Sequence, residues 1–530
     1  MKKTTSQDIK NALWAAADTF RGKIDASNYK DYILSMLFVK YLSDMYKEDI
    51  QKLEEKYSGI MLERQKQYLQ YVMPESATFD YLYKNRNASN IGDLISQALS
   101  SIEDSNITLQ GIFRGIDFNS ESNLGKKEEK NPLLRELLQD FVDLDLKPSS
   151  IECKEGQVPA DIIGDAYEYM IGEFATSAGK KAGSFFTPQA VSEVMACIVN
   201  PQSNERVYDP TCGSGSLLIR AARKDKTNKV KIYGQEKTNS AVSMARMNMF
   251  LHGILDANIA WGDTLSNPLH LDKDSNLMQF ECIVANMPFS LDKWAIGFNQ
   301  GGEMDGEERQ GKEVKFTMEA SLDKYHRFDI GVPPASKGDW AFLLHMIYSM
   351  ANNGRIAAVA PHGVLFRGAS EGRIRQQVLD KNLIDAVIGL PENIFYGTSI
   401  PACILVFRKN KANNDVLFID ASSECEKQKA KNVLRQEDID KIVKVYNAYR
   451  NGTYEELPQE CKDKYSHIAT YNEIQENDYN LNIPRYVDTF EAEEIIDIEK
   501  VNEEIKDLKS KISTIEEKMT AYLKELGIED

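Results

Sequence analysis

The sequence predicts an α/β protein built on a doubly wound, mainly parallel sheet of seven strands. Three observations support this fold class. Between about residues 150 and 410, short β-branched runs alternate with stretches of helix length, a pattern typical of βαβ units. The first 150 residues instead show apolar residues at helical spacing, and the C-terminal segment carries an unbroken heptad pattern. The predicted domains are a helical domain at 1–150, the sheet domain at 151–411, a C-terminal extension at 412–490 and a coiled-coil helix at 491–530.

The N-terminal domain is predicted to be a helical bundle. Residues 28–47 carry apolar side chains at helical spacing, and Pro132 is expected to open another helix that runs to Phe141. The polar stretches 85–90 and 119–130 are expected to be loops. Nothing in this domain points to chemistry, so packing or docking is its expected role.

The sheet domain contains seven runs that we interpret as strands. They are Val207-Tyr208, Val230–Tyr233, Ile259–Trp261, Cys282–Ala285, Ile356–Ala360, Ile384–Ile388 and Cys403–Phe407. A polar, Gly-rich insertion at 292–338 separates the fourth run from the fifth. So long an insertion is typically a mobile loop or a lid.

The C-terminal segment has apolar residues at alternating spacings of three and four, without a break from Ile498 to Leu526. Four heptads of this pattern predict a coiled-coil helix. We expect this helix to pair with another chain, and a helix that lies on its own domain is the alternative.

Composition excludes several classes of protein. The chain has 530 residues, of which 42% are hydrophobic and 27% charged, which excludes a largely disordered or collagen-like chain. No apolar run is long enough to span a membrane, and no apolar signal region follows the N-terminal lysines. The seven cysteines are scattered without a Cys-x-x-Cys pair, which predicts reduced thiols in a cytoplasmic protein and no zinc site.

The net charge of −17 predicts weak affinity for nucleic acid, because cations that neutralise phosphates supply most of that affinity. Residues 491–530 carry thirteen acidic and six basic residues, so much of the acidity lies on the predicted docking helix. The rest of the chain is still acidic, which predicts a protein that needs a partner to hold DNA or RNA.

A Gly-rich turn follows the first predicted strand, in the sequence Asp209-Pro-Thr-Cys-Gly213-Ser-Gly215-Ser216. The two glycines allow a tight turn and close approach of a ligand, and a helix is expected to begin near Ser216. The acid ahead of the glycines would repel a pyrophosphate, and the Gly-Lys-Ser/Thr ending of a phosphate loop is absent. The pattern therefore favours a ligand that carries an amino group.

The next three strands also end in polar side chains. Glu236, Asp263 and Asn286 follow Asp209 at successive intervals of 27, 27 and 23 residues, about one strand-helix unit each. Open α/β sheets bind ligands at the carboxyl ends of their strands, so we expect all four side chains at one edge. Glu236 is placed to accept hydrogen bonds from ribose hydroxyls, and Asp263 from an adenine amino group.

The tetrapeptide Asn286-Met287-Pro288-Phe289 combines groups that can orient an exocyclic amino group on a base for reaction. The Asn286 oxygen and a main-chain carbonyl can both accept hydrogen bonds from one exocyclic amino group, which directs the nitrogen lone pair out of the ring plane. Phe289 can stack on a flipped-out base. For the tetrapeptide alone, a β-turn with a core Phe is the alternative.

Together, the segments 209–215 and 286–289 resemble the S-adenosylmethionine-dependent amino-methyltransferases. More closely, the chain resembles the modification (M) subunit of type I restriction–modification systems, an N6-adenine DNA methyltransferase with the gamma-class order of motifs. The resemblance covers about residues 150–410. It also includes the segments Gly183–Gln189, Lys337–His345, Pro361–Gly368 and Leu390–Tyr396. The family usually has Asn-Pro-Pro-Phe, so Met287 implies a less rigid turn.

The resemblance implies a Rossmann-like methyltransferase sheet that transfers a methyl group from S-adenosylmethionine to N6 of adenine in a specific DNA sequence, without a metal, and so protects host DNA. It implies that Asn286, Pro288 and Phe289 hold the target adenine. The implied cofactor-binding residues are Ser184, Phe185, Phe186, Thr187, Pro188, Gln189, Asp209, Gly213, Ser214, Gly215, Ser216, Glu236 and Asp263.

The resemblance also implies partners. A specificity (S) subunit would read the DNA site with two copies of this chain bound to it, and a restriction (R) subunit is an optional further component. The substrate would be double-stranded DNA with a flipped adenine, and no membrane is involved. Three alternatives remain: a protein glutamine N5-methyltransferase, which has a similar Asn-Pro-Pro-aromatic signature; a non-catalytic scaffold subunit; and a stand-alone modification enzyme with its own recognition domain.

Overall fold

The computed structural model describes residues 3–178, 186–298, 318–395, 400–428, 431–488 and 498–526. The chain forms two compact units, Met1–Val487 and Asp488–Asp530.

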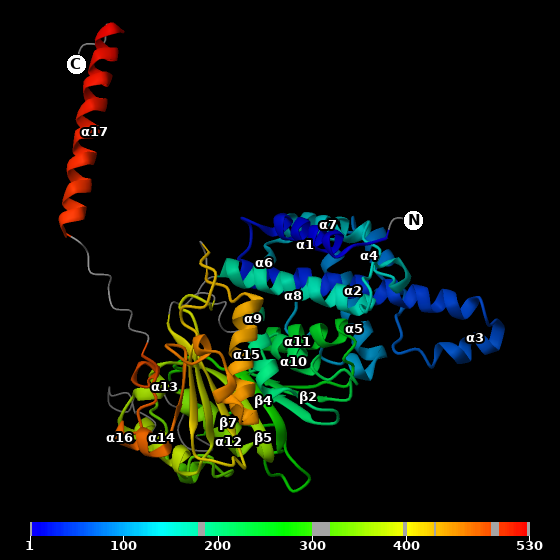
Figure 1. Cartoon of the computed structure of the whole chain (residues 1–530). Coiled ribbons are helices and arrows are strands. Elements are labelled where there is room, and N and C mark those ends of the chain that lie inside the picture. The colour runs from blue at the N-terminus through cyan, green and yellow to red at the C-terminus, as the bar shows by residue number, and fades with distance from the viewer. Residues whose placement is uncertain are drawn as a thin grey trace, which may run out of the picture. The chain divides into compact units, whose positions relative to one another are not determined.

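A nine-stranded sheet is the centre of the first unit (Figure 1), with the strand order β3-β2-β1-β4-β5-β7-β6-β8-β9. The strands are β1 (Arg206–Asp209), β2 (Lys231–Glu236), β3 (Asn258–Trp261), β4 (Phe280–Asn286), β5 (Met350–Pro361), β6 (Ile384–Gly389), β7 (Ala402–Arg408), β8 (Val416–Asp420) and β9 (Ser466–Ala469). Pairing is parallel except at β7 and β9, which run antiparallel to their neighbours. The predicted α/β class and the mainly parallel sheet are confirmed.

All seven predicted runs are strands, but the predicted strand number was too small. β8 pairs with β6 and β9 pairs with β8, so the sheet continues past Lys411 into the predicted C-terminal extension. These two strands are separated by α15 and a long connection, and they pair antiparallel to each other. Such an edge pair lacks the regular βα alternation by which the first seven strands are recognised.

Helices cover both faces of the sheet. One face packs against α9 (Gln189–Val199), α10 (Ser216–Ala222), the inner side of α11 (Asn239–Leu251) and α15 (Gln436–Asn451). The other face packs against α12 (Asp339–Tyr348), α13 (Gly363–Phe366), α14 (Ala369–Asp380) and α16 (Tyr471–Glu476). The result is the three-layered, doubly wound arrangement that the sequence predicts.

The N-terminal region is helical, as predicted. Its helices are α1 (Ser6–Phe20), α2 (Ala26–Glu54), α3 (Gly59–Lys66), α4 (Phe79–Lys84), α5 (Ile91–Ser105), α6 (Glu121–Leu124), α7 (Lys127–Val142) and α8 (Pro159–Ala178). The predicted start of a helix at Pro132 was wrong, because α7 begins five residues earlier and Glu129 accepts a hydrogen bond from the Lys126 amide (3.2 Å). The helix α6 and the start of α7 therefore occupy much of the predicted loop 119–130.

Helix α11 joins the bundle to the sheet, because it is apolar on two sides. Ala245 and Met249 face the sheet core, whereas Met244, Met247 and Phe250 belong to the core of the bundle. The bundle core also includes α8, which the predicted boundary at residue 150 assigns to the sheet domain. α11 thus contributes one side to each of the two apolar cores.

The insertion at 292–338 is not simply a surface loop. Within its described parts, Trp294, Phe298 and Phe328 are buried against the sheet, and their rings contact one another at centroid distances of 5.2–6.0 Å. These aromatic side chains make part of the insertion a layer of the core, which its polar composition concealed. Residues 299–317 lie outside the described residues.

The second unit contains α17 (Ile498–Glu525), which confirms the predicted C-terminal helix. Its heptad residues are exposed within this unit, with Leu508 at 57% and Ile515 at 64%. None of the helices in the described ranges is long and apolar enough to cross a membrane.

We predict that Phe250→Ala lowers the free energy of unfolding by about 3–5 kcal/mol, measured by urea denaturation. Phe250 is buried, and its ring contacts those of Phe38, Tyr41 and Tyr71 in the bundle. The matched control is Ile107→Ala, because Ile107 is 85% exposed, and its effect should stay within about 0.5 kcal/mol. Equal effects of the two changes would contradict the role of α11 as the joint.

Candidate active site

The polar residues that end successive strands meet at one edge of the sheet. Asp209, Glu236 and Asn286 are the last residues of β1, β2 and β4, and Asp263 follows β3 by two residues. Because these four strands are adjacent and parallel, their carboxyl ends converge.

Two adjoining cavities lie at this edge and share Thr211 and Asn286 in their walls. The larger cavity, about 410 Å³, is lined by Glu236, Asp263, Asn286 and Pro288 among the predicted residues. The smaller, about 20 Å³, has room for a single water and is lined by Phe186, Thr187, Asp209, Gly213, Ser214 and Ser216. The larger volume is within the range of small-molecule sites, whereas the smaller must widen to admit more than a water.

The two acids nearest the centre of the site are buried. Burial raises the pKa of Asp209 to about 8, although its carboxylate accepts a hydrogen bond from the Thr211 amide (2.8 Å). Burial also raises the pKa of Glu236, and the two acids repel each other. A cationic ligand in these cavities would offset the cost of ionising both groups.

The Gly-rich turn is fixed from two sides. The Gly213 amide donates to Glu236 Oε2 (3.1 Å), and the buried Asn248 side chain on α11 donates to the Ser214 carbonyl (3.0 Å). Gly213 and Gly215 have φ of +51° and +77°, a conformation that glycine adopts without strain. At Gly215, a Cβ would also approach Met249 Cε to 2.9 Å. The turn therefore requires glycine at both positions.

Asp263 is held by the loop that it belongs to. Its carboxylate accepts hydrogen bonds from the Leu265 amide (2.9 Å) and from Lys237 Nζ (2.8 Å). Lys237 also lines the larger cavity, and its side chain is 74% exposed. An ion pair this exposed is readily displaced, so Asp263 can exchange Lys237 for a ligand donor.

Asn286 lies where the two cavities meet. Its Nδ2 donates to Thr187 Oγ1 (3.1 Å), and no donor in the described part of the chain bonds to its Oδ1. The oxygen can therefore accept a hydrogen bond from an amino group in the cavity. The neighbouring Met287 side chain is buried in the core on the α12 side of the sheet, so packing holds the position that proline has in the family pattern.

The turn after Asn286 is tied down by residues from two of the family-like segments. Asp339 Oδ1 accepts a hydrogen bond from the Ser290 amide (2.6 Å), and Arg367 pairs with Asp339 Oδ2 (3.0 Å). Ser290 has φ of +51°, a strained conformation for a residue other than glycine. Sequence reasoning singled out the segments of Asp339 and Arg367 but gave neither residue a role.

Several predicted residues lie elsewhere. Phe289 lines neither cavity, and its ring packs edge-on against Phe395, with centroids 5.8 Å apart. Pro188 and Gln189 line a separate cavity of about 200 Å³, and Gly215 lines none of the three. Ser184 and Phe185 lie outside the described residues.

The larger cavity also has walls that sequence reasoning missed. Among these residues are Lys237, Thr238, Thr264, Leu265, Trp294, Ile296 and Phe342. The first four adjoin predicted residues in the sequence, and that proximity is the signal that could have found them. Trp294, Ile296 and Phe342 reach the cavity only through the packing of the insertion and α12.

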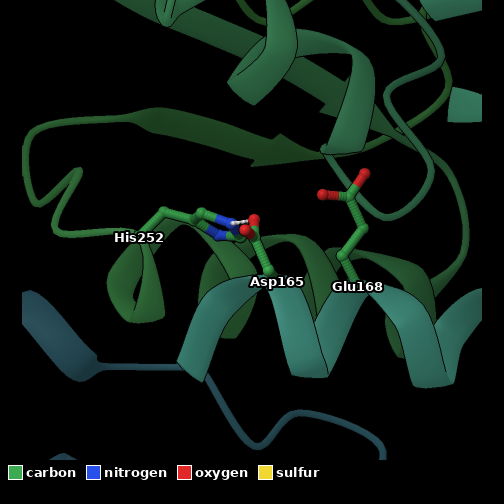
Figure 2. A group of neighbouring side chains, drawn as sticks. All are labelled: Asp165, Glu168 and His252. Carbon is green, nitrogen blue, oxygen red and sulfur yellow. Dashed lines mark ion pairs between the residues drawn. The ribbon is translucent and has the colours of Figure 1, made fainter. Parts of the chain in front are cut away.

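A second group of polar side chains, none of which lines either of the two adjoining cavities, lies on α8 and at the end of α11 (Figure 2). Asp165, Glu168 and His252 place one ligand atom each within 4.8 Å of one another. Arg223, however, already pairs with Asp165 Oδ1 (3.1 Å), and Arg220 lies 3.9 Å from Glu168 Oε1. The group is an ion-pair network that links α8 to α10 and α11.

The chain matches two family models. Residues 158–495 match the N-6 DNA Methylase family, and residues 9–141 match the HsdM N-terminal domain. It is 32% identical to the type I restriction enzyme MpnII methylase subunit of Mycoplasma pneumoniae over 97% of both chains. It is 30% identical to the MjaVII methylase subunit of Methanocaldococcus jannaschii, over 98% of this chain and 85% of the relative.

A solved structure supports the same grouping. The type I restriction–modification methyltransferase subunit from Streptococcus thermophilus is 35% identical and superposes with a TM-score of 0.75. That match covers 92% of this chain and 100% of the other.

We predict that Asp209→Asn stabilises the protein, and more strongly at pH 8 than at pH 5. Between roughly pH 4 and pH 8 the unfolded state loses the Asp209 proton while the folded state keeps it, so the free energy of unfolding falls as the pH rises. Because Asn cannot ionise, the free energy of unfolding of the variant does not include this decrease with pH. Thermal melting at pH 5, 6, 7 and 8 measures the difference in Tm from the wild type.

Asp256→Asn is the control, because Asp256 lies on the surface. Its Tm difference measures the effect of replacing an exposed Asp with Asn at each pH. A pH-independent difference for Asp209→Asn would show that this carboxyl ionises as freely in the folded state as in the unfolded one.

Proposed function

Because the chain belongs to the N-6 DNA methylase family, we propose that the two cavities bind S-adenosylmethionine and a target adenine. The chain is a modification subunit of the type I restriction–modification class, whose reaction is methylation of adenine N6 in DNA. The observation that carries the proposal is the position of Asn286 where the acid-lined cavities meet.

The residues of the cavities fit the cofactor. Glu236 and Asp263 in the larger cavity are acceptors for the ribose hydroxyls and the adenine amino group. Asp209, in the smaller cavity, suits the ammonium group of the amino-acid part, whose charge would complement a buried acid. The smaller cavity must widen to admit that part, and Phe186 and Thr187, which line it, are the residues that we expect to move.

The chain's own contribution to the reaction is to orient the target amine. Asn286 Oδ1 and a main-chain carbonyl of the same turn would accept the two protons of adenine N6, so that its lone pair points out of the ring plane. When bound, S-adenosylmethionine supplies an electrophilic methyl on its sulfonium. Asp339 and Arg367 fix the turn that carries Asn286, which favours a preorganised acceptor.

Phe289 packs on Phe395, which is compatible with two roles. Either its ring turns toward the base when DNA binds, or Phe395 and Phe289 together form the wall on which a flipped adenine stacks. Both roles keep Phe289 near the target base, as proposed from the sequence.

The partner that we propose is a DNA-reading specificity subunit, with two copies of this chain bound to it in the cytoplasm. The exposed apolar stripe of α17 supports this proposal, because a helix with such a stripe is stabilised by a second apolar helix. The overall charge of −17 supports it too, because it predicts weak DNA affinity for the chain alone.

We predict that Asn286→Ala lowers the rate of methyl transfer at least about a hundredfold, because the target amine loses its side-chain acceptor. The dissociation constant for S-adenosylmethionine should change less than about threefold, since Ala keeps the backbone of the strand end. Tritium transfer to DNA and calorimetric titration measure the two quantities in the complex with the specificity subunit.

The matched control is Asn258→Ala, because Asn258 begins β3 at the opposite edge of the sheet and is exposed. This variant should transfer methyl groups at the wild-type rate. If the Asn286→Ala variant transferred methyl groups at the wild-type rate, the role proposed for Asn286 would be wrong.

We predict that a chain ending at Asp488 binds S-adenosylmethionine normally but forms no complex with the specificity subunit on size exclusion. The truncation removes the second unit and leaves the cavities intact. Within the full chain, Ile512→Glu should weaken the complex about tenfold or more, whereas Ser510→Glu should not, because Ile512 lies on the apolar stripe. A truncated chain that assembles fully would reject α17 as the docking helix.

A further inference from the structure

Arg327 is a buried arginine in the described part of the insertion, with 1% of its surface exposed. Asp323 balances its charge through a close ion pair (2.8 Å). The guanidinium also donates to the carbonyls of Thr264 (3.3 Å) and Leu265 (2.6 Å). The insertion, although polar in composition, therefore places one buried and fully paired charge, that of Arg327, beside the loop after β3.

The two carbonyls belong to the loop after β3, which is part of the wall of the larger cavity. Gly262, Asp263, Thr264 and Leu265 all line that cavity. The Thr264 hydroxyl in turn donates to the Pro210 carbonyl (2.5 Å), which ties this loop to the one after β1. Arg327 thus holds the loop that carries Asp263 without lining the cavity itself.

A fourth partner, His345, fixes the direction of the hydrogen bonds around Arg327. Arg327 Nη1 lies 3.1 Å from His345 Nδ1, and a guanidinium can only donate, so Nδ1 is the acceptor. His345 is therefore neutral with its proton on Nε2, which donates to Tyr208 Oη (3.0 Å). Burial and the nearby Arg327 charge lower the pKa of His345 well below its usual value, in agreement with the neutral form. Tyr208 directly precedes Asp209, so the network reaches both sides of the site.

We propose that Arg327 is a positioning residue for the cofactor, which sets the conformation of the loop 262–265 and so the placement of Asp263. The inference rests on the proposed cofactor site and deepens it. This proposal gives the insertion a function. Through Arg327, the insertion contributes affinity for the adenosine part of the cofactor without lining the cavity at that residue.

The chain offers a matched control for this role. Arg355 is also buried, pairs with Glu205 (2.7 Å) and donates to the carbonyls of Val199 and Asn200. None of these four residues lines the cavities. Arg355 therefore reproduces the structural part of the Arg327 interactions at a place remote from the site.

The test compares Arg327→Lys with Arg355→Lys in the full-length chain. Lysine keeps the charge but cannot bond both carbonyls and the carboxylate as a planar fork does. Both variants should melt at a lower temperature than the wild type. Only Arg327→Lys should raise the dissociation constant for S-adenosylmethionine about tenfold or more, measured by calorimetric titration, because a displaced loop misplaces its ligand contacts.

Activity gives a second readout. In the complex with the specificity subunit, Arg327→Lys should raise KM for S-adenosylmethionine while kcat stays within about threefold, because the Asn286 turn is held by other residues. Arg355→Lys should leave both constants within about twofold.

The outcomes separate the two proposals. Wild-type protein that fails to bind S-adenosylmethionine overturns the proposed function and this inference with it. Two results overturn the inference alone, given that the wild type binds S-adenosylmethionine normally. One is an unchanged affinity in Arg327→Lys, and the other is an equal loss of affinity in both lysine variants. If Arg327→Lys does not fold, the double change Asp323→Asn with Arg327→Gln replaces it, since it leaves no unpaired buried charge. The same loss of affinity is expected from that variant, and unchanged affinity again overturns the inference.

Discussion

The parallel pairing of β1 with β2 on one side and β4 on the other is the constraint on which the site depends. β1 has only four residues, and a shift of one residue would turn Asp209 to the other face of the sheet. An ion pair at the start of the strand fixes the register, because Arg206 binds Glu281 on β4 through both its guanidinium (2.6 and 3.0 Å) and its amide (2.9 Å). The stacked rings of Tyr208 and Phe280, 4.3 Å apart, secure the same pairing further along.

Once the register is fixed, the loops at the strand ends are held by buried polar side chains that come from elsewhere in the sequence. Asn248 of α11 holds the Gly-rich turn after β1, Arg327 of the insertion holds the loop after β3, and Asp339 of α12 holds the turn after β4. Each bonds to a main-chain group, so it sets the backbone and leaves the cavity side chains free. α11 and the insertion are therefore parts of the site as well as parts of the core.

The distribution of charge also favours a positively charged ligand in the site. Asp209 and Glu236 are buried together at a cost to the folded state, since their pKa values are raised and they repel each other. Two buried acids this close together are complementary to a positively charged ligand, whose charge would offset the cost of ionising them. The acidity of the whole chain, at −17, predicts no comparable affinity for the phosphates of DNA, which is why we propose that a partner subunit supplies that affinity.

The sequence by itself determined the fold class, the seven strands from β1 to β7 and the meeting of Asp209, Glu236, Asp263 and Asn286 at one edge. It could do so because β-branched runs repeat at the length of a βα unit, and parallel strands bring their ends together. Only the tertiary structure decided how the loops are held, which walls the insertion contributes, and that Phe289 rests on Phe395. Arg327 and Asp339 show the reason. Their main-chain partners Leu265 and Ser290 lie 62 and 49 residues away in the sequence, and no local sequence pattern predicts which main-chain group a buried charge will bind.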